Sequence, residues 1–133
     1  MVLLERINVN IAANAMIILN LCLVMFDVLI MVGIVPYNIV WGGRFENISE
    51  MYVFEMTSIV LSLAIAAVIG IKAGYIKPYI SKKGVTMIMW SLVMFFSLNT
   101  LGNIASTNPL ETILFTPITV IATILCYRLA IDK

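Results

Sequence analysis

The stretch IAANAMIILNLCLVMFDVLIMVG, residues 11–33, carries one charged side chain and is otherwise almost entirely apolar. Three further apolar blocks follow it, at residues 53–73, 85–105 and 110–130. A helix rises ~1.5 Å per residue, so a block of about 20 residues spans the ~30 Å hydrocarbon core of a bilayer. We therefore predict a single transmembrane domain over residues 1–133, with one helix for each block.

The composition agrees with this class of protein. Apolar residues make up 62% of the chain and charged residues 11%, against about 25% charged residues in a typical soluble domain. Because the connections between the blocks are short, consecutive helices are expected to be antiparallel neighbours. The predicted fold is an all-α integral membrane four-helix bundle with up-down-up-down topology, whose surroundings are the lipid bilayer and not nucleic acid.

The distribution of basic residues predicts the orientation of the bundle. The chain has 8 Lys and Arg residues, and in a four-span topology all but Arg44 fall on one side. These are Arg6, Lys72, Lys77, Lys82, Lys83, Arg128 and Lys133. Cytoplasmic loops of membrane proteins carry the excess of Lys and Arg. Both termini are therefore predicted to be cytoplasmic. The first block is too long for the apolar region of a signal peptide, so we expect it to be retained.

Several kinds of chemistry find no support in the residues. The chain has no histidine and two cysteines, so the commonest general base and metal ligand is absent. Cys22 and Cys126 lie inside different spans, without the spacing of a metal or redox motif. No cofactor or metal is expected, and an enzyme is the least favoured class.

Polar residues inside the spans are the candidates for a site, because an ionisable group at membrane depth is costly and needs a partner or a task. Glu50 and Glu111 are explained as acids in the first turn of a helix. Asp27 and Glu55 are not. The topology places a set of polar residues in the outer half of the bundle, and these are the candidate ligand-binding residues: Asp27, Arg44, Glu55, Asn99, Asn103 and Thr116.

Two interpretations of this set stay open. It is either a network that only fixes the packing of the helices, with Arg44 paired to Glu55, or the lining of a polar cavity. Two repeats are equally ambiguous. Small residues recur every four positions at Ser58, Ser62, Ala66 and Gly70, which favours close packing inside the bundle or a homodimer contact. Threonines at 112, 116, 119 and 123 either bond their own backbone or line a site, and Pro117 among them predicts a kink.

Local signals mark the ends of the predicted helices. Asn47 and Glu50 have the spacing of a capping box at the start of the second span, and Gly74 is a plausible end for it. Pro36 is expected to end the first helix. Asn108, Pro109 and Glu111 form a start signal for the fourth.

The strings PYNIVWGGR, YVFE, LNTLGN and FTPIT resemble those of uncharacterised small four-span bacterial integral membrane proteins. The resemblance implies a multi-pass protein of the inner (plasma) membrane and transfers no activity. The signatures of fluoride channels, small multidrug transporters and PQ-loop sugar transporters are missing. The expected function is binding or transport of a small solute, cation or lipid headgroup at the outer polar pocket. The alternative is a non-catalytic accessory or assembly protein whose polar cluster is structural.

Overall fold

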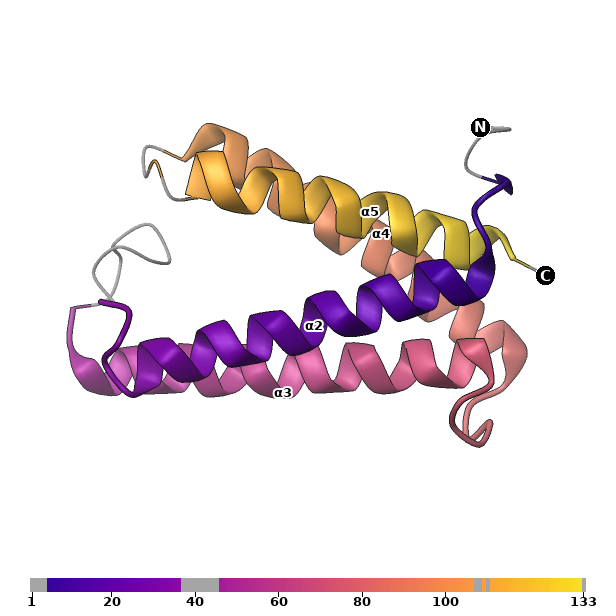
Figure 1. The fold of residues 1–133 in the computed structure, drawn as a ribbon, viewed down its shortest axis with the longest axis horizontal. Helices are drawn as coiled ribbons and strands as arrows, with labels where there is room; N and C mark the ends of the chain where they lie inside the picture. Colours follow the sequence, from indigo (N-terminus) through magenta and orange to yellow (C-terminus); the bar gives the residue numbers. More distant parts are fainter. Residues whose placement is uncertain (1–4, 37–45, 107–108, 110, 133) are drawn as a thin grey trace.

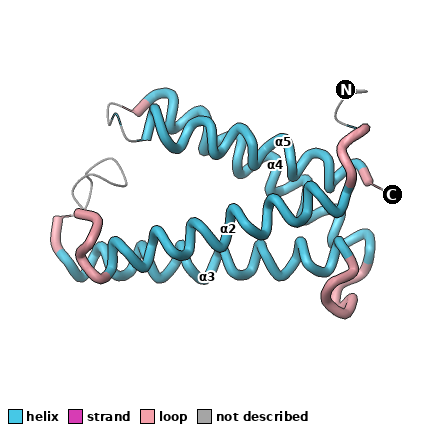
Figure 2. The backbone as a smooth tube through the Cα atoms, in the orientation of Figure 1, coloured by secondary structure: helices cyan, strands magenta, loops and turns pink. Residues whose placement is uncertain are grey.

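The computed structural model describes residues 5–36, 46–106, 109 and 111–132, and their regular structure is helical throughout. The helices are α2 (Val9–Met31), α3 (Ile48–Ala73), α4 (Lys82–Ala105), η3 (Glu111–Phe115) and α5 (Thr116–Ile131). Four helical segments in this part of the chain, with η3 and α5 forming the last, are long and apolar enough to cross a membrane. The chain is therefore a multi-pass helical membrane protein, as its sequence predicted (Figure 1, Figure 2).

The ends of α3 follow the predicted local signals. The side chain of Asn47 accepts a hydrogen bond of 2.9 Å from the backbone N–H of Glu50, which satisfies one of the donors that a helix start leaves open. The helix ends at Gly74, whose φ of +85° is left-handed. Glycine adopts this conformation without steric cost, so the predicted stop is confirmed.

The end of α2 differs from the prediction. The helix stops at Met31, five positions before the proline that was expected to end it. Gly33 has a φ of +88° and turns the backbone out of the helix before Pro36 is reached. The permissive glycine, and not the ring of Pro36, sets this boundary.

The helices pack as two pairs, α2 with α3 and α4 with α5. The hydroxyl of Tyr52, near the start of α3, donates to the carbonyl of Met31 at the end of α2. Tyr75, just past the end of α3, bonds Asn14 near the start of α2 at 2.8 Å. The two pairs converge at the end where α2 begins and α5 finishes, and separate toward the opposite end (Figure 1).

The main hydrophobic core lies at the convergent end. Small side chains there allow the backbones to approach closely, among them Ala12 and Ala13 of α2 and Ala122 of α5, which are fully buried. Larger core residues fill the remaining space: Met16, Ile65, Ile69, Val85, Met89, Leu92, Phe96 and Leu129. A separate small cluster, Ile30 with Met51, holds the other end of the α2–α3 pair. The fold is thus tightly closed at one end only.

An ionic cluster ties the elements together at the convergent end. The Lys72 ammonium of α3 lies 3.3 Å from the Asp132 carboxylate, and Arg128 of α5 lies 3.8 Å from the same group. Arg128 also donates to the backbone carbonyl of Ile7 at 2.6 Å. The sequence predicted a cluster of polar residues in the outer half of the bundle only. This ionic cluster was not expected, because Asp132 follows the last apolar block.

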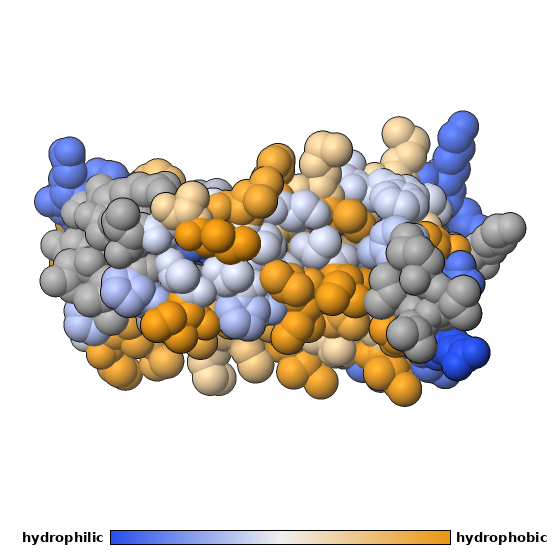
Figure 3. Space-filling view, turned by 90° about the horizontal axis from the view of Figure 1, so that it is seen from above, coloured by the Kyte–Doolittle hydropathy of each residue, from blue (hydrophilic) through white to orange (hydrophobic). Residues whose placement is uncertain are grey.

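The lateral surface is apolar, as a bilayer requires. On the face seen in Figure 3, strongly hydrophobic side chains and side chains of intermediate hydropathy cover the middle, and the most hydrophilic ones lie at the two ends. Ile11, Met25 and Met94 are more than 60% exposed. Such a surface would be a liability in water, whereas in a membrane it faces lipid chains.

The fourth span begins with a π-helical turn. η3 covers residues 111–115 and changes to α-helix at Thr116, with Pro117 in the first turn of α5. Proline lacks the N–H that would bond the carbonyl four residues earlier, and wider turns commonly absorb such a defect. The kink predicted at Pro117 stays a prediction; what the structure has is a π-helical turn immediately before the helix that contains this proline.

Candidate functional site

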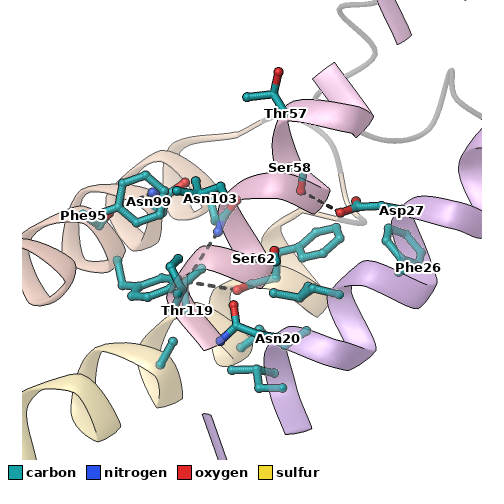
Figure 4. A pocket seen from close by; sticks show the side chains of 18 of the residues that line it. Asn20, Phe26, Asp27, Thr57, Ser58, Ser62, Phe95, Asn99, Asn103 and Thr119 are labelled. Carbon is teal, nitrogen blue, oxygen red and sulfur yellow. Dashed lines mark hydrogen bonds between the residues drawn. The ribbon is translucent and has the colours of Figure 1, made fainter. Parts of the chain in front are cut away.

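A cavity of about 480 Å³ lies between the two helix pairs. It occupies the half of the molecule where the pairs separate, and α2, α3, α4, η3 and α5 all contribute to its wall (Figure 4). Most of the wall is apolar and includes phenylalanines at positions 26, 54, 95, 96 and 115. The polar lining residues are Asn20, Asp27, Thr57, Ser58, Ser62, Asn99, Asn103 and Thr119.

Asp27 is the ionisable residue of the wall, and it is 5% exposed. The hydroxyl of Ser58 donates to its Oδ2 at 2.7 Å, across the α2–α3 contact. Figure 4 shows the two side chains pointing toward each other, while Thr57 points away. A buried carboxyl with one hydroxyl donor keeps lone pairs for a further donor or a cation.

Glu55 is the second acid of this region. It is fully buried, lies one helical turn before Ser58 in α3, and its carboxyl interacts with that of Asp27. Among the described residues, no group of three or more Asp, Glu, Cys or His side chains is placed to hold a metal ion.

Thr119 is the centre of a hydrogen-bond network on the opposite wall. Its hydroxyl oxygen accepts from the Thr100 hydroxyl at 2.9 Å and from the Asn103 amide at 3.4 Å. It donates in turn to the backbone carbonyl of Phe115 at 3.0 Å. These bonds join α4 to α5 and fix the Asn103 side chain at the cavity wall (Figure 4).

Two further amides bond their own helix. Asn20 donates to the carbonyl of Met16, and Asn99 donates to the carbonyl of Phe95, each at 2.8 Å. This i to i−4 bond satisfies an amide hydrogen locally. It leaves the amide oxygen of each residue as an acceptor in the cavity wall.

Two aromatic rings meet where α2 faces η3. The rings of Phe26 and Phe115 are 5.7 Å apart at an angle of 66°, an edge-to-face arrangement that aromatic pairs prefer. Phe115 is the last residue of η3, so the π-helical turn delivers it to this contact.

The predicted site residues divide into three groups. Asp27, Asn99 and Asn103 line the cavity. Glu55 and Thr116 do not: Glu55 is fully buried outside the wall, and Thr119 is the threonine of α5 that lines the cavity. Arg44 lies outside the described residues, so its pairing with Glu55 stays a prediction.

Sequence reasoning missed Ser58 and Ser62 as lining residues, because their four-residue spacing was interpreted through helix packing alone. Both lie in the cavity wall, so this part of the stripe on α3 faces the inside of the chain. Asn20 was also left out of the site. Its position seven residues before Asp27, two turns along the same face, was the signal that could have included it.

Comparison of the chain with protein-family models, with curated proteins and with solved structures finds no match. The fold and the cavity define a four-span helical membrane protein with an internal polar site. What the site does has to be argued from its own geometry.

Proposed function

We propose that this protein binds a small molecule within the membrane, in the cavity between its two helix pairs. The ligand class is a small solute, a cation or a lipid headgroup. The observation that carries the proposal is a buried carboxyl, Asp27, in the wall of a cavity of about 480 Å³. An ionisable group at membrane depth is by default a sign of function.

The size and lining of the cavity support this function. Ligand sites typically measure about 300–1,000 Å³ and combine an apolar wall with a few oriented polar groups. A four-helix core packed to ordinary density leaves few voids larger than a water molecule. The space between the pairs is far larger than that.

The hydrogen bonds of the polar lining residues favour a ligand over a purely structural network. Ser58 to Asp27 stays within the α2–α3 pair, and Asn103 to Thr119 stays within the α4–α5 pair. A network that fixed the packing of the bundle would be expected to link the pairs. Among the described lining residues, the polar groups instead face each other across open space.

The orientation in the membrane is part of the proposal. An up-down-up-down bundle with cytoplasmic termini agrees with the contact of Tyr52 with the end of α2 and with the basic residues Lys72 and Arg128 at the convergent end. The cavity then lies in the outer half of a bacterial inner membrane. Moving the ligand across the bilayer would require a second copy of the chain, because one copy closes tightly at its convergent end.

The second candidate function is a non-catalytic accessory or assembly protein. The observation behind it is that the bonds within each helix pair hold the pair together without any ligand. In that case the cavity would be filled by lipid and would show no saturable binding.

A photoreactive benzyl alcohol, carrying a diazirine on the ring, separates the two functions. With the purified chain in lipid nanodiscs, labelling should map to residues of the cavity wall and be saturated by excess benzyl alcohol. Gly102 lines the cavity and has open space where a Cβ would stand, so Gly102→Leu should suppress this labelling. Ala105→Leu, at the exposed end of the same helix, is the matched control. Labelling that cannot be saturated and is equal in both variants would support the accessory function.

A further inference from the structure

The polar atoms that the cavity wall offers to a ligand are predominantly acceptors. The amides of Asn20 and Asn99 donate to backbone carbonyls, and that of Asn103 donates to Thr119. The hydroxyls of Ser58 and Thr119 donate within the chain as well. These groups leave open the second N–H of each amide and a larger number of oxygen lone pairs, among them those of the Asp27 carboxyl. A wall of this kind is complementary to a ligand that donates hydrogen bonds.

The charge of the wall has one sign. Its ionisable residue is Asp27, and no Lys or Arg is among the described lining residues. An ionised Asp27 gives the wall one negative charge. One monovalent cation neutralises it, whereas an anionic ligand would be repelled in a low-dielectric site.

The aromatic rings of the wall also favour a cation. Five phenylalanines line the cavity. Phe26 is next to Asp27 in α2, and its ring contacts that of Phe115 in η3. The faces of aromatic rings attract cations, more strongly when water is excluded. The same rings accommodate an apolar body.

We propose that the ligand is an organic ammonium ion, a protonated amine attached to an aromatic or aliphatic body. This inference rests on the binding function proposed above. The ammonium group donates to Asp27 and to the amide oxygens of the wall, and the apolar body lies against the phenylalanines. Asp27 supplies the charge that selects it.

Three probes of one size test this choice: diazirine-bearing benzylamine, which is cationic at neutral pH, the corresponding benzyl alcohol and the corresponding benzoate. Labelled residues are mapped on the purified chain in nanodiscs, and the concentration for half-saturation is compared. The half-saturating concentration of the ammonium probe should be lower than that of the alcohol by a factor of about ten or more. Asp27→Asn should abolish this difference while the alcohol still labels the cavity, which also shows that the variant is folded.

A second variant keeps the test independent of Asp27. Phe26→Leu should raise the half-saturating concentration of the ammonium probe roughly three- to tenfold more than that of the alcohol, because both probes lose contact with the ring and only the ammonium loses the attraction of its face. Met25→Leu, on the lipid-exposed face of the same helix, is the control. Equal saturation by amine and alcohol, or preference for benzoate, overturns the ammonium ligand and leaves the binding function standing. If no probe labels the cavity saturably, the binding function itself fails.

Discussion

The hydroxyl of Ser58 and the carboxyl of Asp27 are joined by a hydrogen bond of 2.7 Å, between positions 31 residues apart in the chain. Both groups lie well inside long apolar helices, and Asp27 is 5% exposed. The bond therefore has two roles: it fixes α3 against α2, and it orients the carboxyl at the cavity wall. Removing either partner should separate these roles.

Ser58→Ala removes the hydroxyl donor, and we expect it to lower the free energy of unfolding by about 0.5–1.5 kcal/mol, because a buried hydrogen bond between two helices is lost. Thermal unfolding in detergent, followed by circular dichroism, measures the effect. Ser91→Ala is the matched control, since Ser91 is exposed and bonds only the carbonyl of Met87 in its own helix. Equal effects of the two variants would show that the Ser58 bond contributes nothing specific.

Asp27→Asn keeps the size of the side chain and an oxygen that can accept from Ser58, so stability should change by less than about 1 kcal/mol. The preference for the ammonium probe over the alcohol should nevertheless be lost, because the amide carries no charge. Half-saturation and thermal unfolding are measured on the same preparation. Unchanged behaviour in both measurements would leave Asp27 with a packing role alone.

The sequence predicts those features that depend on residues close together in the chain. Spans and caps depend on neighbouring residues, so the start of α3 at Asn47 and its stop at Gly74 were both predictable. The depth of Asp27, Asn99 and Asn103 follows from counting along each helix, and all three line the cavity. These properties need no knowledge of how the helices pack.

The remaining errors come from rotation about a helix axis. Thr116 and Thr119 lie in one stripe of the sequence, and both belong to α5. Three residues separate them, which turns their side chains about 60° apart around the helix axis, and Thr119 is the one that bonds α4 and lies in the wall. Pro117 signalled an irregularity without specifying its form. Similarly, the tertiary contact with Asp27 gave Ser58 a role that its spacing alone could not reveal.

Asp132→Asn should destabilise the convergent end. Lys72, whose side chain is 6% exposed, and Arg128 both face the Asp132 carboxylate, so the substitution leaves two cations with weaker partners. We expect a loss of about 1–3 kcal/mol in the free energy of unfolding. Glu5→Gln changes an exposed acid at the same end of the molecule. It is the control and should change the free energy of unfolding by less than about 0.5 kcal/mol. Ligand labelling of the cavity should be unaffected by either change.

Gly102→Ala should stabilise the protein. Gly102 lies inside α4, and a Cβ there meets no atom within 4 Å. Replacing a glycine in a helix by alanine gains about 0.5–1 kcal/mol, because the unfolded chain loses conformational freedom. The midpoint of thermal unfolding should rise. Gly74→Ala provides the contrast, since a φ of +85° strains alanine and should lower the midpoint. A fall with Gly102→Ala would mean that the space beside it is occupied.

Impermeant thiol reagents can establish the orientation of the bundle. A cysteine at Glu46, next to the start of α3, should react in intact cells, and one at Lys82, at the start of α4, should react only after the membrane is opened. The reason is that Lys72, Lys82 and Lys83 belong to the side richer in basic residues, which membrane proteins retain in the cytoplasm. Choosing Glu46 preserves the cap that Asn47 supplies to α3. The unmodified chain, with exposed Cys22 in α2 and buried Cys126 in α5, gives the background reactivity. The opposite labelling pattern would place both termini outside the cytoplasm and move the cavity to the inner half of the membrane, where its ligand would be drawn from the cell interior.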